Sequence, residues 1–426
     1  MTTSHKPRIC IAFPGLHYVH YSPYILGTLP LLPYLSQDFE VSLAFRKNLE
    51  EPLAGYSFLT FLDSQNLSER EQNNKNIYFS PPDYLRLFKY QRLLKKFTSE
   101  HAKDFDLVIE KEWPFLGVLA QAFSEYDIPT IVVAEAVFNF PEKTTPFWKL
   151  NNPTQLLNQT LAIGYHKARP ILRKRWTKNA TRIVGETEQL KNYLQSQGDL
   201  LPNQPVDVIP NGIDPQVFYP QDRTVCREQL GIPQDAFVLT YVGSLNRFIQ
   251  EPAYLIEALG RERNPRTVLY MVGDGVSRQE LEEIAKTWNS PVVFTGRVSQ
   301  AEAARYINAA NLCVAPYNKG LFPDNQFTSA SLKVCEYLAC GRLAITIPCD
   351  RMNHLLDGGQ YGFFVENSSE SYHRFIQDLP SFEELSDRES RLLSDLQNSL
   401  LKEKQIVLTW EDIAQLYKQS FEKALA

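Results

Sequence analysis

The chain has 426 residues, of which 43% are hydrophobic and 22% charged, and its formal net charge at pH 7 is −5. The length suffices for two domains, because single hydrophobic cores stop growing near about 250–300 residues. The acidic balance argues against a general nucleic-acid binder, which is usually strongly basic. The N-terminus lacks the apolar core of a signal peptide, and no apolar stretch approaches the ~18–20 residues that a membrane-spanning helix needs.

The six cysteines predict buried, reduced thiols. None forms a C-x-x-C pair, and no histidine stands at zinc-finger spacing. Most lie in apolar runs, where free cysteine packs as a small hydrophobe. Reduced thiols fit a reducing compartment, so we expect a cytoplasmic protein.

The first half of the chain predicts a parallel sheet of short apolar strands. The expected strands are Arg8–Phe13, Val41–Phe45, Asp106–Ile109, Thr130–Ala134 and Thr181–Val184, with helices at Leu116–Phe123 and Glu188–Gln195. The first strand is expected to end at a turn containing Gly15, where the backbone can approach a sugar or phosphate. Residues 50–80 and 139–165 have no regular pattern.

The second half alternates strands and helices more regularly, after a Pro-, Gln- and Asp-rich connector at Leu201–Asp235. Its expected strands are Phe237–Val242, Val268–Val272, Val292–Thr295, Leu312–Ala315, Leu343–Ile347 and Phe363–Val365. Such continuous apolar strands, joined by helices, predict a parallel sheet covered on both faces. The chain therefore predicts an α/β protein with two doubly wound sheets, whose strands would bind ligands at their carboxyl ends in a shared cleft.

One segment, Thr328–Glu336, combines residues suited to a nucleotide. Thr328 or Ser329 can cap a helix start, and the amides and dipole that follow attract phosphate oxygens. Lys333 adds a positive charge, and Glu336 lies three residues further along the same helix face. The rise along the helix to Glu336 is about 9 Å, close to the span from a distal phosphate to ribose hydroxyls. The alternative is an ordinary surface Lys–Glu pair on an amphipathic helix.

Six motifs follow one another between residues 180 and 426. They are Val208-Ile209-Pro210-Asn211-Gly212-Ile213-Asp214, Tyr241-Val242-Gly243-Ser244-Leu245, Met271-Val272-Gly273-Asp274-Gly275, Phe294-Thr295-Gly296-Arg297-Val298, Lys333…Glu336-Tyr337-Leu338-Ala339-Cys340-Gly341 and Leu408-Thr409-Trp410-Glu411-Asp412-Ile413-Ala414. In this order they resemble the motifs of the GT4-type (group 1) retaining glycosyltransferases, which have the GT-B fold. The first half matches in pattern but not in motif.

The resemblance implies two Rossmann-like lobes that face a central cleft. Residues 1–205 would form the acceptor-side lobe, completed by a C-terminal helix at 409–426 that crosses back to it. Residues 206–408 would form the lobe that binds a nucleotide-diphosphate sugar as co-substrate, with no cofactor.

The resemblance also implies roles for matched positions. Glu336 would bind ribose hydroxyls. Lys333 and the main-chain amides of Ala330, Ser331 and Leu332 would hold the diphosphate. The remaining donor-site positions would be Gly15, Gly243, Ser244, and the main-chain atoms of Arg297 and Val298 that meet the base.

Several positions depart from the family pattern. The usual glutamate eight residues before Glu336 is replaced by Thr328. Ser244 and Ile249 stand where the family has Arg and Lys in the loop after the first strand. Arg247 could supply the lost charge, or it could be a solvated loop residue.

In the first lobe, Glu135 aligns with a family histidine, and Glu110-Lys111-Glu112 with its H-x-H. Relative to the family pattern, the phosphate-binding positions are therefore retained, whereas the positions that contact the sugar are altered. The resemblance implies a retaining, metal-independent hexosyltransferase whose catalytic candidates are Lys333, Arg247 and Glu135.

Two basic stretches in the first half bear on the acceptor: Asp83–Lys103 and His166–Arg182. Basic amphipathic helices suit anionic membrane surfaces, so a lipid-linked or cell-surface glycan precursor and a peripheral contact at the inner membrane surface are one interpretation. Ordinary packing of a solvated helix on the sheet is the other.

Two other functions stay open. A catalytically inactive GT-B homologue that binds a nucleotide sugar would explain Thr328, Ser244 and Ile249. A sugar-nucleotide epimerase would need acid/base carboxylates around the sugar, for which Glu110, Glu112 and Glu135 are candidates. A phosphorylase of the same architecture is the other enzyme alternative. No nucleic-acid partner is expected.

Overall fold

The computed structural model describes residues 5–18, 25, 27–61, 87–113, 116–135, 160, 171–247, 249–262 and 266–426. The stretch at 139–165 lies outside these residues, apart from Thr160. The same holds for the beginnings of both basic stretches, at 83–86 and 166–170.

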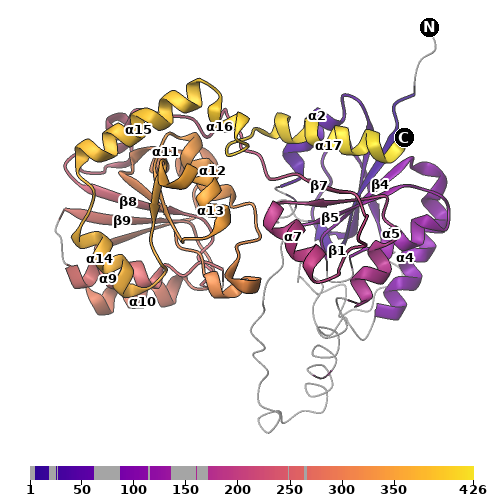
Figure 1. The fold of residues 1–426 in the computed structure, drawn as a ribbon, viewed down its shortest axis with the longest axis horizontal. Helices are drawn as coiled ribbons and strands as arrows, with labels where there is room; N and C mark the ends of the chain where they lie inside the picture. The colour runs from indigo at the N-terminus through magenta and orange to yellow at the C-terminus, as the bar shows by residue number, and fades with distance from the viewer. Residues whose placement is uncertain are drawn as a thin grey trace. The chain divides into compact units, whose positions relative to one another are not determined.

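The described residues form two compact units (Figure 1). The first contains those up to Pro210 together with Trp410–Ala426, and the second contains Asn211–Thr409. The sequence placed the first boundary five residues earlier. It lies later because β7 (Val206–Val208) pairs with β6 (Arg182–Gly185) and so extends the first sheet.

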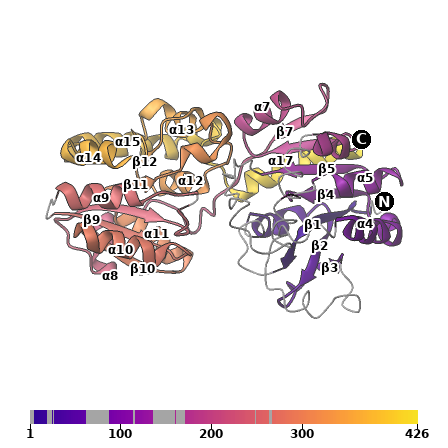
Figure 2. The same ribbon diagram turned by 90° about the horizontal axis from the view of Figure 1, so that it is seen from below.

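The first unit is built on a parallel sheet in the order β3-β2-β1-β4-β5-β6-β7 (Figure 2). Besides β6 and β7, its strands are β1 (Arg8–Tyr18), β2 (Glu40–Asn48), β3 (Ser57–Thr60), β4 (Leu107–Lys111) and β5 (Thr130–Ala134). Strand β5 is buried along its whole length, as a continuous apolar strand in a sheet covered on both faces should be.

Strand β1 does not end at Gly15, as the sequence predicted, but continues to Tyr18. Its register with β2 shifts between Phe13 and His17, so the strand absorbs the expected turn as a local irregularity. A Cβ on Gly15 would lie 2.7 Å from Cβ of Trp113. The glycine therefore allows close packing against an indole inside the first unit.

The helices of the first unit are α2 (Leu32–Leu35), α4 (Leu87–His101), α5 (Val118–Ser124), α7 (Glu188–Ser196) and α17 (Trp410–Leu425). Helix α17 packs against α2, β4 and β5, and Figure 1 shows it beside α2. Phe421 meets Phe39 edge to face with ring centroids 5.4 Å apart, and the Ser420 hydroxyl donates to Asp207 at 2.8 Å. The last helix thus completes the first unit, in agreement with the expected return of the C-terminal helix.

The second unit has a parallel sheet in the order β10-β9-β8-β11-β12-β13. Its strands are β8 (Phe237–Val242), β9 (Thr267–Val272), β10 (Val292–Gly296), β11 (Leu312–Ala315), β12 (Ala344–Thr346) and β13 (Gly362–Phe364). This is the doubly wound order that the sequence predicted, in which strands are added outward on either side of β8 and β11.

The helices of the second unit connect these strands. They are α8 (Arg223–Leu230), α9 (Ala253–Glu262), α10 (Arg278–Trp288), α11 (Gln300–Ala309), α12 (Leu332–Ala339), α13 (Asp350–Leu355), α14 (Ser369–Gln377), α15 (Phe382–Gln397) and α16 (Leu400–Glu403). Four of them begin at a residue whose side chain accepts an amide of the first turn: Asp222, Ser299, Ser368 and Ser381. Such caps fix where a helix starts.

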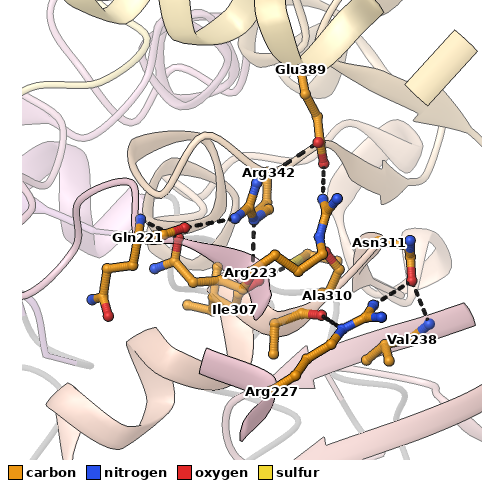
Figure 3. A network of polar contacts seen from close by, with 12 residues as sticks. Gln221, Arg223, Arg227, Val238, Ile307, Ala310, Asn311, Arg342 and Glu389 are labelled. Atoms are coloured by element: carbon orange, nitrogen blue, oxygen red, sulfur yellow. Dashed lines mark hydrogen bonds and ion pairs between the residues drawn. The ribbon is translucent and has the colours of Figure 1, made fainter. Parts of the chain in front are cut away.

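A buried polar network fixes the beginning of the second unit (Figure 3). Arg223 pairs with Glu389 and donates to the Ala310 carbonyl at 2.9 Å. Arg342 approaches the other oxygen of Glu389 at 3.8 Å and donates to the Gln221 carbonyl at 2.9 Å. One carboxylate on α15 therefore faces two arginines that hold the chain entering α8.

The expected connector at Leu201–Asp235 is consequently not a plain linker. Its first part supplies β7 to the first sheet, and its second part supplies α8 to the second unit. Arg227 on α8 donates to Asn311 Oδ1 at 2.8 Å, and Asn311 also accepts the Val238 amide at 2.7 Å. These contacts tie α8 to β8 and to the start of β11.

All six cysteines lie among the described residues and are free thiols; five are buried and Cys349 is partly exposed. Among the described helices, none is both long enough and apolar enough to cross a membrane.

Candidate functional site

The second sheet has its switch point between β8 and β11. Only the first residues of β11 pair with β8, at Leu312 with Leu239 and Cys313 with Thr240, so the strands separate towards their carboxyl ends. The Tyr337 hydroxyl from α12 lies in the gap. It accepts the Val242 amide at 3.1 Å and lies 3.3 Å from the Val314 carbonyl. Helix α12 is therefore held where ligands bind in doubly wound sheets.

Three glycines join the carboxyl ends of β8, β9 and β10. Gly243, Gly273 and Gly296 have φ values of 148°, 138° and 77°, which favour glycine. A Cβ on Gly273 would lie 1.9 Å from the Gly243 carbonyl oxygen, and the Gly273 amide donates to the Gly296 carbonyl at 3.0 Å. The three motifs containing these glycines thus meet at one edge of the sheet.

The loops after these glycines carry further candidates. Ser244 is exposed, and its carbonyl accepts the Tyr241 hydroxyl at 2.6 Å. Arg297 is exposed and Val298 is half-buried, both directly after Gly296. All three positions therefore lie at the carboxyl edge of the second sheet.

Helix α12 begins without a side-chain cap. Its N-cap is Ser331, not Thr328 or Ser329, and Ser331 has the left-handed φ of 59°. The Ser331 hydroxyl bonds instead to the Tyr317 hydroxyl at 2.7 Å. No acceptor within the described residues takes the amides of Leu332 and Lys333. These amides and the positive end of the helix dipole are therefore available to an anion.

Just before the helix, Ala330 is buried, and its carbonyl accepts from the Arg351 guanidinium at 3.3 Å. Arg351 follows β12 and lies at the start of α13. The sequence gave no signal for this contact, which holds the turn that precedes α12.

Lys333 and Glu336 lie on α12, and both are partly exposed. Among the described residues, neither side chain has a hydrogen bond or ion pair. Burial lowers the pKa of Lys333 to about 8, and Glu336 partly opposes this shift. Burial raises the pKa of Glu336 to about 7, against the effect of Lys333. An unpaired ammonium and an unpaired carboxylate on one helix suit a ligand with both anionic and hydroxyl groups.

Arg247 is already engaged. Its guanidinium contacts both oxygens of Glu251, at 2.8 Å and 2.9 Å, and pairs with Glu280. The carboxylates raise the pKa of Arg247. To contact a diphosphate it would have to leave these partners. Ile249, two residues on, packs against the core.

In the first unit, Glu110, next to the last residue of β4, is a buried structural carboxylate. It accepts the Trp113 indole N–H at 2.7 Å and the amides of Gly117 and Ala120 at 2.9 Å each. Burial raises the pKa of Glu110 to about 7. Since Trp113 also packs on Gly15, these two sequence candidates belong to one packing unit that orders the start of α5.

Glu135 follows β5 and pairs with Lys111 at 2.7 Å, both side chains being largely buried. Although burial opposes its charge, the nearby Glu135 carboxylate holds the pKa of Lys111 above its usual value. Beside them, Glu112 pairs with Arg173. The carboxyl ends of β4 and β5 thus carry two ion pairs rather than isolated acids.

The structure therefore brings most of the candidates together at the carboxyl edge of the second sheet: Gly243, Ser244, Arg297, Val298, Ala330, Ser331, Leu332, Lys333 and Glu336. Gly15 and Glu135 lie in the first unit. No cluster of metal ligands occurs among the described residues.

Solved structures that are similar to this chain have the same architecture. The sucrose-phosphate synthase of Thermosynechococcus elongatus matches with a TM-score of 0.66 and 18% identity, over 98% of this chain and 100% of that one. HepE of Anabaena, solved in complex with UDP, matches with a TM-score of 0.68 and 15% identity, over 97% and 99%. At such identities the likeness shows the fold alone. This chain, with its two doubly wound units, has the GT-B fold.

Two family models match in succession. The model described as Glycosyltransferase Family 4 matches residues 38–217, and the model described as Glycosyl transferases group 1 matches residues 236–380. The chain belongs to the family 4 glycosyltransferases. The resemblance noted in the motifs of the second half is thereby confirmed, and the family extends to the first half, where no motif was legible.

Known relatives match over part of their length. A D-inositol 3-phosphate glycosyltransferase of Nocardioides sp. is 29% identical over 207 residues, 44% of this chain and 43% of that protein. A probable sucrose-phosphate synthase of Thermosipho melanesiensis is 23% identical over 261 residues, 58% and 55%. The chain spans less than half the length of the first relatives it matches.

Proposed function

We propose that this protein transfers a sugar from a nucleoside-diphosphate sugar to a hydroxyl of an acceptor. The observation that carries the proposal is the start of α12 at the switch point. There, uncapped amides, the Lys333 ammonium and the Glu336 carboxylate share one short helix without hydrogen-bond or ion-pair partners among the described residues.

The donor would lie along α12. The diphosphate would meet the amides from Ala330 to Leu332 and Lys333, and Glu336 would accept bonds from two vicinal ribose hydroxyls. The base would meet main-chain atoms at Arg297 and Val298. UDP, which is bound in the solved structure of HepE, is the first nucleotide to test.

The reaction would retain the anomeric configuration. The bond between the anomeric carbon and the leaving phosphate oxygen breaks, and the acceptor oxygen forms its bond on the same face. The acceptor proton passes to the leaving phosphate, so no protein base is required. Lys333 and the α12 terminus would stabilise the charge that develops on the diphosphate, and no metal ion is needed for that step. Arg247 would add to it only after leaving Glu251 and Glu280, and Glu135 would act with Lys111 as its partner.

The acceptor is proposed to be a lipid-linked or other glycan precursor, at an anionic membrane surface. In α4, Leu94 and Phe97 are buried, whereas Arg92, Lys95 and Lys96 are exposed. Attachment through this helix would therefore be electrostatic, without insertion of its apolar face. Flotation with anionic but not neutral liposomes, lost at high salt, is the expected result; flotation with neither would remove the membrane from the proposal.

One observation favours a second candidate function, an inactive protein that binds a nucleotide sugar. Thr328 is fully buried where the family has a glutamate, so no carboxylate reaches the sugar from that position. The epimerase reading has less support, because Glu110, Glu112 and Glu135 all have protein partners.

A screen of UDP-, GDP-, ADP- and TDP-sugars in EDTA tests the proposal. Thermal stabilisation by one nucleotide class together with slow sugar release is expected. Lys333→Met should abolish release, whereas Lys286→Met, at an exposed position on α10, should leave it intact. Stabilisation without release, with or without acceptors, would favour the inactive binder, and no stabilisation by any nucleotide would contradict the donor site.

A further inference from the structure

The Lys333 ammonium lies against two aromatic rings. Its Nζ is 5.2 Å from the centre of the Tyr317 ring and 5.5 Å from that of Tyr241. Tyr241 comes from the carboxyl end of β8, and Tyr317 from the loop after β11. Both distances are within the ~6 Å over which a cation is attracted to an aromatic face.

Each ring is fixed in place by its hydroxyl group. The Tyr241 hydroxyl donates to the Ser244 carbonyl at 2.6 Å, and the Tyr317 hydroxyl bonds to the Ser331 hydroxyl at 2.7 Å. Ser244 belongs to the loop after β8, and Ser331 begins α12. The two rings therefore hold the ammonium relative to the two backbone segments that surround the candidate phosphate site.

Gly243 leaves room for this arrangement. A Cβ at that position would lie 3.3 Å from Cε and from Nζ of Lys333, and equally close to the Tyr241 hydroxyl. Since Gly243 has a φ of 148°, a side chain there would be both strained and in contact with the ammonium. Gly243 therefore places no side chain of its own against the Lys333 ammonium.

The choice of rings over a carboxylate has a chemical consequence. A carboxylate partner would neutralise Lys333 and would have to be displaced by an incoming diphosphate. An aromatic face stabilises the ammonium in a partly desolvated place but leaves its charge in full. The only acidic group that influences the pKa of Lys333 among the described residues is Glu336, one turn away on the same helix.

We propose that Tyr241 and Tyr317 are positioning residues, which hold the Lys333 ammonium by cation–π contact with its full charge directed at the donor diphosphate. The inference rests on the proposed function and deepens it, since it assigns the role of keeping the phosphate-binding lysine charged and oriented to two side chains that do not themselves contact the donor.

The test varies the attraction of the ring at position 317 for a cation, while the size of the ring stays nearly the same. The reference variant is Tyr317→Phe. In three further variants, position 317 carries mono-, di- or trifluorinated phenylalanine, and each added fluorine weakens the attraction between the ring and a cation. The full-length protein is titrated with UDP-glucose by calorimetry, and the Lys333 ammonium is titrated with pH by NMR. We expect affinity to fall stepwise, by roughly threefold to tenfold from phenylalanine to the trifluorinated ring. The Lys333 pKa should fall in the same order, because the charged form loses its stabilisation.

Two controls separate this effect from general packing. The same series at the buried Tyr372 on α14, whose hydroxyl has no partner among the described residues, should leave both readouts unchanged. In a Lys333→Met background, fluorination of position 317 should no longer alter affinity.

The outcomes distinguish the two levels of the proposal. Binding of UDP-glucose that is indifferent to fluorination, with an unchanged Lys333 pKa, overturns the positioning role and leaves the proposed function standing. If the wild-type protein binds no nucleoside-diphosphate sugar, the proposed function is overturned, while the NMR titration still decides whether the rings hold the ammonium.

Discussion

At the proposed donor site, the ionisation of Lys333 and Glu336 should confine donor binding to a narrow pH range. The diphosphate would require charged Lys333, whose pKa is lowered to about 8, and the ribose hydroxyls would require ionised Glu336, whose pKa is raised to about 7. Affinity for UDP-glucose, whose phosphates do not titrate here, should therefore be highest between these values. It should fall up to tenfold per pH unit on either side.

Substitutions test which residue causes the loss of UDP-glucose affinity at acidic pH (the acidic limb) and which causes the loss at alkaline pH (the alkaline limb). Lys333→Met should remove the alkaline limb. It should also move the acidic limb upward, because Lys333 is the group that lowers the pKa of Glu336. Glu336→Gln should remove the acidic limb. A profile that is flat from pH 6 to 9 in the wild-type protein would contradict the assignment of both residues.

Gly243 offers a second prediction at this scale. Gly243→Ala should weaken UDP-glucose binding at least tenfold, because the methyl group would press on Lys333. Gly231→Ala, at the end of α8, is the matched control: its φ of 67° is also left-handed, but nothing lies within 4 Å of a Cβ there. Gly231→Ala should lose about 1 kcal/mol of unfolding free energy. Gly243→Ala should lose more, up to about 3 kcal/mol, because a φ of 148° is found essentially only for glycine. Equal affinities would show that crowding of Lys333 does not matter.

Single residues differed in how far the sequence disclosed them. Lys333 and Glu336 could be singled out because their spacing places a cation and a carboxylate on one helix face, and Gly243 because its motif resembles that of the family. Tyr317 could not be singled out from the sequence. A tyrosine after an apolar strand is typical of the core, and only the fold shows that it contacts Lys333. Arg247 was recognised as a charge, but its partner Glu280 is 33 residues away and only packing reveals it.

At the scale of elements, Tyr337 links α12 to the diverging strands β8 and β11. Tyr337→Phe should lower the unfolding free energy by about 1 kcal/mol, because the partly buried Val242 amide loses its acceptor. Tyr372→Phe removes a hydroxyl that has no partner among the described residues and should change stability little. Chemical denaturation compares the two; an equal loss in both would deny the bridging role.

Elements were predictable where apolar runs were continuous. The bounds of β5, β8 and β11 agree with the expected strands residue for residue, because burial on both faces leaves an uninterrupted apolar signal. Strands β3 and β7, of four and three residues, were missed. They are short and only partly buried, so pairing to a neighbour defines them rather than their own composition.

For the molecule as a whole, the integrity of the second unit depends on contacts distant in sequence. Glu389→Gln should destabilise it by about 3 kcal/mol, because Arg223 and Arg342 would be left without their shared carboxylate. Glu384→Gln on the same helix disrupts only a more exposed pair with Arg388 and should cost less than about 0.5 kcal/mol. Thermal unfolding of both variants provides the measurement, and comparable stabilities would exclude a structural role for the network.

The division into two units followed from the alternation of strands and helices and from the length. Its details did not. The first boundary lies at Pro210 because β7 joins the first sheet, and Glu389 meets Arg223 across 166 positions. Such long-range pairs leave no local pattern in one sequence.

The most direct measurement is hydrogen–deuterium exchange of the peptide covering 328–339, with and without UDP. The amides of Leu332 and Lys333 lack acceptors among the described residues, so they should exchange quickly in the free protein and slowly once a diphosphate accepts from them. We expect this protection in the wild-type protein and its loss in Lys333→Met. Binding of UDP with unchanged exchange at 328–339, and protection elsewhere, would contradict the placement of the donor at the start of α12.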